Sequence, residues 1–104
     1  MTKGLFLDSA NYCVENAIER INEYILKNKS KKLLVDISKF NFIEATNICI
    51  LSSTFLFTQN PENKITWIVD SQNTQKNIDR LKLKNMTLEV KQQNIYNQSN
   101  LAKI

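Results

Sequence analysis

Apolar positions along the chain alternate between short continuous runs and longer stretches with helical spacing. Four short runs rich in branched or alternating apolar residues predict strands, at 3–7, 32–38, 64–70 and 86–91. The run at 32–38 is apolar almost throughout, which is typical of a strand covered on both faces. The run at 86–91 alternates with period two, which favours a sheet edge with one solvated face.

Three helices are expected between these strands. Helical spacing of five apolar residues predicts an amphipathic helix of roughly 18 residues that closes near Asn28, and Asp8 and Ser9 are candidate N-caps for it. Residues 47–57 are apolar nearly all round and predict a buried helix. A weaker helix follows Asp70 and Ser71, which are its candidate caps. The apolar residues of the first predicted helix are Val14, Ala17, Ile18, Ile21 and Ile25, and those of the third are Ile78, Leu81 and Leu83.

The resulting order is β-α-β-α-β-α-β, with short connections between the elements. Such an order favours an α/β fold with a mainly parallel four-stranded sheet and right-handed crossovers. A length of 104 residues allows one core. We therefore expect a single domain over 1–91, followed at 92–104 by a polar tail or a short helix.

Composition limits the classes of function. The chain is 42% hydrophobic and 23% charged, which is ordinary for a globular protein. The sequence has no apolar stretch long enough for a membrane span and no secretory signal, so a soluble, cytoplasmic protein without membrane insertion is expected. Histidine is absent and glycine occurs once, at Gly4, which removes the commonest general base and metal ligand and every glycine-rich phosphate loop. We expect no catalytic residue, no metal, no cofactor and no enzymatic activity.

The cysteines and the net charge suggest no further site. Cys13 and Cys49 are 36 positions apart, fit no metal-binding spacing, and are expected to be buried free thiols. The net charge of +4 raises the alternative of nucleic-acid binding. The basic residues are scattered among acids, however, apart from a short lysine run at 27–32, so a solvated surface without a nucleic-acid partner is favoured.

The stretch LLVDISKFNFIEATNICIL at 33–51 resembles the central motif of STAS domains. This family comprises bacterial anti-sigma-factor antagonists and the cytoplasmic domains of sulfate transporters. Asp36-Ile37-Ser38 is similar to the family's strand end, and Phe42-Ile43 to the approach to its helix. Glu44 takes the acidic position, Thr46 the second hydroxyl position and Ile48 the leucine. With the similar strand, helix and edge strand downstream, the resemblance covers roughly residues 9–90.

The sequence departs from the family pattern at functionally important positions. The serine that a partner kinase phosphorylates in regulatory members is Ala45 here, and the family glycine is Asn47. The N-terminus is also one strand short of the family pattern. Thr46 could serve as an alternative phosphoryl acceptor, but a role as helix cap is favoured. Glu44 could act only as an acid near the positive end of the helix.

The resemblance implies a regulatory protein-interaction module of bacterial type that docks a partner through the loop 38–47 and the start of the second helix. Implied partners are an anti-sigma kinase-like protein, another STAS domain or a transporter component, and a homodimer is possible. Of the loop aromatics, alternation predicts one packed inward and the other exposed, although both could belong to the core. The candidate docking residues are Phe40, Phe42, Glu44, Ala45, Thr46 and Asn47.

An alternative function is the binding of a small ligand, such as a nucleotide or an anion, at the ends of the strands. Asp36, Asp70 and Ser71 follow directly on apolar strand runs. Because α/β sheets collect ligands beyond the carboxyl ends of their strands, these side chains could line such a site. Residues in such positions also cap turns, and this simpler role remains open for all three.

Overall fold

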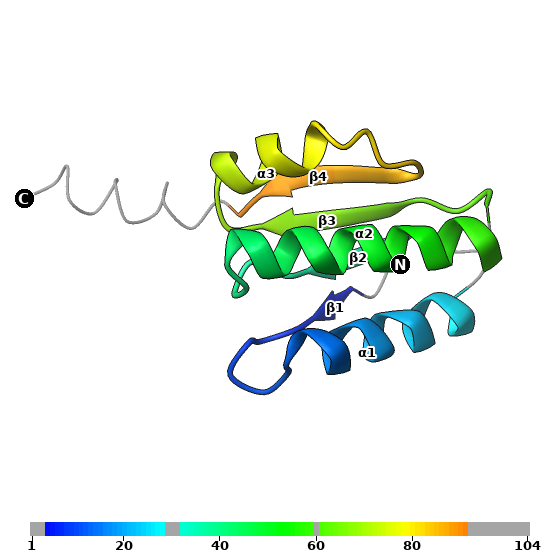
Figure 1. The fold of residues 1–104 in the computed structure, drawn as a ribbon. Coiled ribbons are helices and arrows are strands. Elements are labelled where there is room, and N and C mark those ends of the chain that lie inside the picture. The colour runs from blue at the N-terminus through cyan, green and yellow to red at the C-terminus, as the bar shows by residue number, and fades with distance from the viewer. Residues whose placement is uncertain (1–3, 29–31, 60, 92–104) are drawn as a thin grey trace, which may run out of the picture.

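The computed structural model describes residues 4–28, 32–59 and 61–91, in which strands and helices alternate along the chain (Figure 1). The strands are β1 (Leu5–Phe6), β2 (Leu33–Asp36), β3 (Ile65–Val69) and β4 (Met86–Val90). The helices are α1 (Val14–Lys27), α2 (Phe42–Gln59) and α3 (Gln72–Asp79). The predicted order of elements is confirmed. The expected tail or helix at 92–104 lies outside the described residues.

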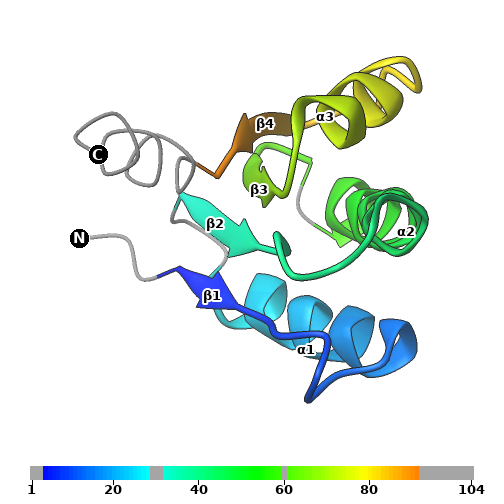
Figure 2. The same ribbon diagram turned by 90° about the vertical axis from the view of Figure 1, so that its left-hand side faces the viewer.

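All four strands are parallel and lie in the order β1-β2-β3-β4. The predicted α/β fold with a parallel sheet is therefore confirmed. Because each of the four described strands pairs with its neighbours in the sequence, their order does not reverse, and these strands form no switch point of the kind at which doubly wound folds bind ligands. Figure 2 shows α1, α2 and α3 together on one side of the sheet, with α2 in the middle.

The core lies between the sheet and this layer of helices. Alternate residues of β2 and β3 point toward the helices and are fully or almost fully buried, because successive side chains of a strand face opposite ways. Trp67 is the largest of them. It packs in one cluster with Ile21 of α1, Ile48 of α2 and Ile78 of α3, so one core unites the three helices.

The expectation that 32–38 forms a strand covered on both faces is wrong for the described part of the chain. Leu34 and Ile68 point away from the helices and are only half-buried, and Phe6 is half exposed on β1. No helix within residues 4–28, 32–59 and 61–91 covers this second face (Figure 2). The expected alternation of β4 is confirmed, with exposed Thr87 and Glu89 between half-buried neighbours.

The first helix begins later than the sequence suggested. It starts at Val14, and the N-cap position is Cys13, which makes no side-chain capping bond. Asp8 instead stabilises the preceding turn, in which its backbone carbonyl accepts from the N–H groups of Asn11 and Tyr12. Its carboxylate accepts from the N–H of Ala10. The expected capping of this helix by Asp8 or Ser9 is therefore wrong.

The two cysteines differ in environment. Cys49 is fully buried in α2, and burial raises the pKa of its thiol well above the ordinary range. Cys13 is exposed, which corrects the expectation of two buried thiols. Neither cysteine belongs to a cluster that could hold a metal, since the described residues contain no group of three potential metal ligands.

The third helix is capped as predicted, but it places fewer residues in the core than predicted. The Ser71 hydroxyl accepts from the N–H of Thr74 at 3.3 Å, which makes Ser71 the N-cap. Ile78 is buried, whereas Leu83 is half-buried beyond the helix and Leu81 is exposed. The helix ends at Asp79, so Leu81 and Leu83 lie outside it.

Candidate functional site

The junction between β2 and α2 is organised by the Asp36 carboxylate. One carboxylate oxygen accepts from the Ser38 N–H at 2.9 Å and from the Ser38 hydroxyl at 2.6 Å. The other oxygen accepts from the Lys91 ammonium at 3.1 Å, an ion pair that links the end of β2 to the residue after β4. The same ammonium lies 5.3 Å from the centre of the Phe6 ring. Asp36 therefore connects β2, the loop after it and the end of the sheet.

These contacts set the protonation state of Asp36. Burial by itself raises the pKa of this carboxyl group, because the charged form loses hydration. The hydrogen bonds from Ser38 and Lys91 stabilise the carboxylate more strongly, and the net effect is a pKa below the ordinary value for aspartate. Asp36 is an ionised structural residue at neutral pH.

A capping box starts α2. The Asn41 side-chain oxygen accepts from the Glu44 N–H at 2.8 Å, and the Glu44 carboxylate accepts in return from the Asn41 N–H at 3.1 Å. This reciprocal pair satisfies backbone donors that the first helical turn leaves free. Glu44 therefore has a structural role at the helix start, and Asn41 is the capping residue.

Thr46 does not cap the helix, because it lies one turn inside α2. Its hydroxyl donates to the Phe42 carbonyl at 2.6 Å and accepts from the Asn77 side-chain amide of α3 at 3.1 Å. The expected cap at Thr46 is thus corrected: the residue joins α2 to α3. The hydroxyl is occupied on both its donor and its acceptor side.

The two loop aromatics are separated as alternation predicted, with one inside and one outside. Phe40 is 1% exposed and belongs to the core, whereas Phe42 is 47% exposed at the first position of α2. Ala45 is also 1% exposed. Phe40 and Ala45 are therefore not available to a partner in this structure, which corrects their inclusion among the docking residues. Phe42 and Asn47 are exposed, and Glu44 and Thr46 are half-buried.

The exposed apolar surface extends further along α2 than the sequence indicated. Ile43 is 61% exposed, Leu51 54% and Phe57 44%. Glu44 is the one charged residue of this 18-residue helix. The largely apolar, uncharged sequence predicts a buried helix, because it gives no sign of which face meets solvent.

A groove separates the start of α2 from α3. It has a volume of about 550 Å³ and is lined on one wall by Asn41 and Phe42. The α3 wall carries Lys76, Asn77 and Arg80, and Asp70 lies among the remaining lining residues. The exposed Phe42 ring therefore borders a predominantly basic groove.

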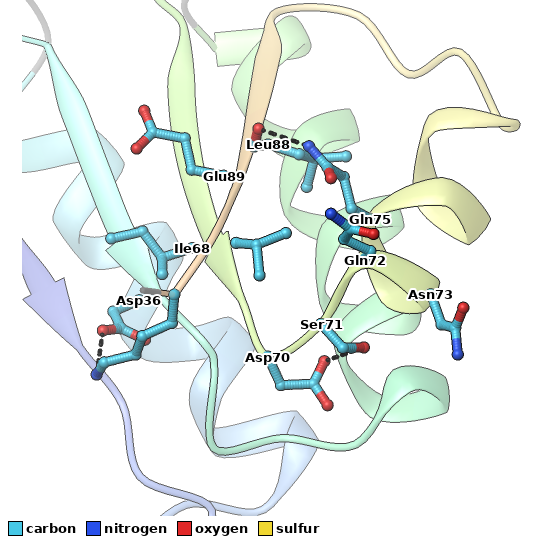
Figure 3. Close-up of a pocket in the computed structure, with 11 residues that line it drawn as sticks. Asp36, Ile68, Asp70, Ser71, Gln72, Asn73, Gln75, Leu88 and Glu89 are labelled. Atoms are coloured by element: carbon cyan, nitrogen blue, oxygen red, sulfur yellow. Dashed lines mark hydrogen bonds and ion pairs between the residues drawn. The ribbon is translucent and has the colours of Figure 1, made fainter. Parts of the chain in front are cut away.

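The three candidate ligand-binding residues line one open cleft beyond the carboxyl ends of the strands. Asp36, Asp70 and Ser71 share this cleft of about 1020 Å³ with Glu89 and Lys91 (Figure 3). Asp70 accepts from the Thr74 hydroxyl at 2.6 Å and from the Ser71 hydroxyl at 3.3 Å. Both aspartates are thus engaged in local hydrogen bonds, and the cleft carries more acidic than basic side chains.

Comparisons of the chain with protein-family models, with curated proteins and with solved structures find no match. Among the described helices, none has the length and apolar character needed to cross a membrane.

Proposed function

We propose that this chain is a non-catalytic protein-interaction module that docks a partner through the loop 38–47 and the start of α2. The observation that carries the proposal is the exposure of Phe42 and Ile43, two large apolar side chains side by side on a helix start. Exposed aromatic and aliphatic residues beside a groove are the usual anchors of protein interfaces.

The character of α2 supports the same conclusion. A helix at the surface of a monomer normally carries charged side chains on its solvent face, and a helix that is apolar all round is normally buried. In α2 the exposed positions are apolar or uncharged, and Glu44 is held in the capping box. A protein partner that covered this face would remove apolar surface from water. Each Å² removed would contribute about 25 cal/mol of favourable free energy to the complex.

The contacts at the helix start do not favour a phosphorylation switch. Ala45 occupies the position of the phosphorylated serine in the STAS family that the sequence resembles, and its methyl group is buried. The neighbouring Thr46 hydroxyl is held between Phe42 and Asn77. We therefore propose docking that is not controlled by serine phosphorylation at this position.

The resemblance suggests the class of partner. An anti-sigma kinase-like protein, another STAS domain or a transporter component would each give the module a regulatory role. Each of these roles needs only a binding surface on this chain and no catalytic residue.

Affinity capture from the native cell tests this proposal. The tagged full-length chain is compared with Ile43→Asp and with Thr87→Asp, a matched change at an exposed position on the other face of the sheet. Ile43→Asp places a charge in the docking surface, so we expect at least about tenfold less captured partner, equivalent to about 1.4 kcal/mol. Thr87→Asp is expected to capture as much partner as the wild type. Equal capture by all three proteins would contradict the proposal.

The alternative is a small-ligand site, favoured by the convergence of Asp36, Asp70 and Ser71 on one cleft. The excess of carboxylates there disfavours an anion. Thermal-shift measurements with magnesium, ADP and sulfate discriminate between the two functions. A stabilisation that disappears in Asp70→Asn would favour the ligand site, and no stabilisation would leave protein docking.

A further inference from the structure

The outer face of α2 carries five residues at alternating spacings of four and three. Ile43, Asn47, Ile50, Thr54 and Phe57 thus lie on one stripe, which runs the length of the helix. Ile43, Asn47, Thr54 and Phe57 are exposed, and Ile50 is half-buried. This spacing is the heptad pattern with which one helix packs against another. In it, Ile43, Ile50 and Phe57 take the d positions, and Asn47 and Thr54 the a positions.

Rows of exposed side chains with opposite charges lie on the two sides of α2. On α1, the exposed residues Glu15, Glu19 and Glu23 follow one another at intervals of four and form an acidic row. α2 lies between α1 and α3 (Figure 2). The acidic row therefore lies on one side of the uncharged stripe.

On the other side, Lys76 and Arg80 are exposed and four residues apart. Lys84, beyond the end of α3, lies with its ammonium 5.1 Å from the centre of the Phe57 ring. These three residues form a basic row. Within the described residues, no member of the acidic or the basic row takes part in an ion pair, since the ion pair found there joins Lys91 and Asp36.

This arrangement of acidic row, uncharged stripe and basic row is complementary to a second copy of itself in one orientation. A two-fold axis parallel to α2 lays two copies of the helix side by side in parallel, and it places the acidic row of each copy opposite the basic row of the other. A two-fold axis perpendicular to α2 makes the helices antiparallel and sets acidic row against acidic row. Charge complementarity therefore selects the parallel arrangement.

We propose that the partner covering the outer face of α2 is a second copy of this chain, related by a two-fold axis parallel to the helix. This inference rests on the proposed docking function of α2 and names the partner of that surface. The parallel arrangement brings each stripe residue against its own counterpart. Asn47 then meets Asn47 of the second copy, and a paired asparagine at an a position is known to fix register and two-fold pairing in parallel helix dimers.

The available surface lies near the lower limit for a specific dimer. The helices α1, α2 and α3 have 14, 18 and 8 residues, which makes them about 21, 27 and 12 Å long. At about 9 Å of width for each helix, their outer faces amount to roughly 540 Å² per copy. Specific interfaces bury about 600–1,000 Å² per partner. The helix layer as a whole, rather than α2 alone, is therefore required.

Sedimentation equilibrium of the purified full-length chain tests the dimer. We expect a mass of two 12.1 kDa chains at micromolar concentration. Thr54→Lys would place two ammonium groups against each other near the axis and is expected to raise the dissociation constant at least tenfold. Because Thr54 is exposed, the change should leave the unfolding midpoint unaltered at chain concentrations at which the wild type is monomeric. Thr87→Lys, on the other face of the sheet, is expected to remain dimeric.

Disulfide trapping tests the orientation. In a Cys13→Ser background, the parallel arrangement predicts that Asn47→Cys forms an intermolecular disulfide on mild oxidation, because equivalent a positions approach within disulfide range. The buried Cys49 thiol does not compete. In an antiparallel pair the a positions face d positions, so residue 47 would face residue 50 or residue 57, and mixed Asn47→Cys with Ile50→Cys or Phe57→Cys chains would cross-link instead.

The outcomes separate this inference from the proposed function. A chain that is monomeric at all concentrations would contradict the proposed dimer. A dimer whose dissociation constant is unchanged by Thr54→Lys, or that forms disulfides only in the antiparallel combination of cysteines, would also contradict it. If such a chain still captured a different protein in an Ile43-dependent manner, the docking function would stand without the dimer. A dimer that is weakened by Thr54→Lys and forms the intermolecular disulfide between Asn47→Cys chains would confirm the inference.

Discussion

At the scale of single residues, the polar side chains around the β2–α2 junction are occupied by local structure. Asp36 binds Ser38 and Lys91, Asn41 binds Glu44, and Thr46 binds Phe42 and Asn77. The sequence identified Asp36 as a candidate because acids at strand ends are typical of sites, and Glu44 and Thr46 because of the resemblance to the STAS motif. It could not identify their partners Asn77 and Lys91, which are 31 and 55 positions away.

The role of Asp36 predicts a pH-dependent contribution to stability. Its pKa is lowered in the folded state, so its contribution is fully present above its unfolded pKa of about 3.9 and is lost as the pH falls through the lower folded pKa. Asp36→Asn is expected to reduce the free energy of unfolding by about 1–3 kcal/mol at pH 7. The difference from the wild type should shrink at lower pH. Urea unfolding at pH 7 and at a pH below about 3.9 measures this difference in the free energy of unfolding.

Glu89→Gln is the matched control for this prediction, since Glu89 is an exposed carboxylate in the same cleft. It is expected to change stability by less than about 0.5 kcal/mol at either pH. A loss for Asp36→Asn that is the same in acid as at pH 7 would contradict the assignment of an ionised, hydrogen-bonded Asp36.

At the scale of elements, α2 was predicted in kind but not in extent. Its apolar residues indicated a helix at 47–57, whereas the helix spans Phe42–Gln59. The helix starts earlier than predicted, because the expected cap is Thr46 whereas Asn41 and Glu44, three residues apart, form the capping box. The exposed face could not be predicted, because it depends on how the helix is turned against the sheet.

The capping box predicts the effect of removing Asn41. Asn41→Ala leaves the first-turn N–H of Glu44 without its partner and is expected to lower the free energy of unfolding by about 1 kcal/mol. Asn16→Ala, at an exposed position inside α1, is the control and is expected to be neutral or slightly stabilising. Both are measured by urea unfolding. Equal stability of Asn41→Ala and the wild type would show that α2 starts by another means.

At the scale of the whole molecule, the order of elements and the parallel sheet followed from the sequence. Short runs of branched residues and stretches with helical spacing alternate, and short connections allow few other topologies. The one-sided placement of the helices did not follow, because Leu34 and Ile68 make the central strands look buried on both faces. Helix α2 consequently occupies the middle of an exposed layer, where its uncharged face is available to a partner.

The most direct test of α2 as a protein-binding surface is site-specific photocross-linking in the native cell. A photoreactive phenylalanine analogue replaces Phe42, an exposed aromatic at the helix start, and in a second variant it replaces Phe6, an aromatic that is similarly exposed on the face of the sheet opposite the helices. We predict a covalent protein adduct from position 42 and none from position 6. An absence of adduct at position 42, or equal adducts at both positions, would contradict docking through α2.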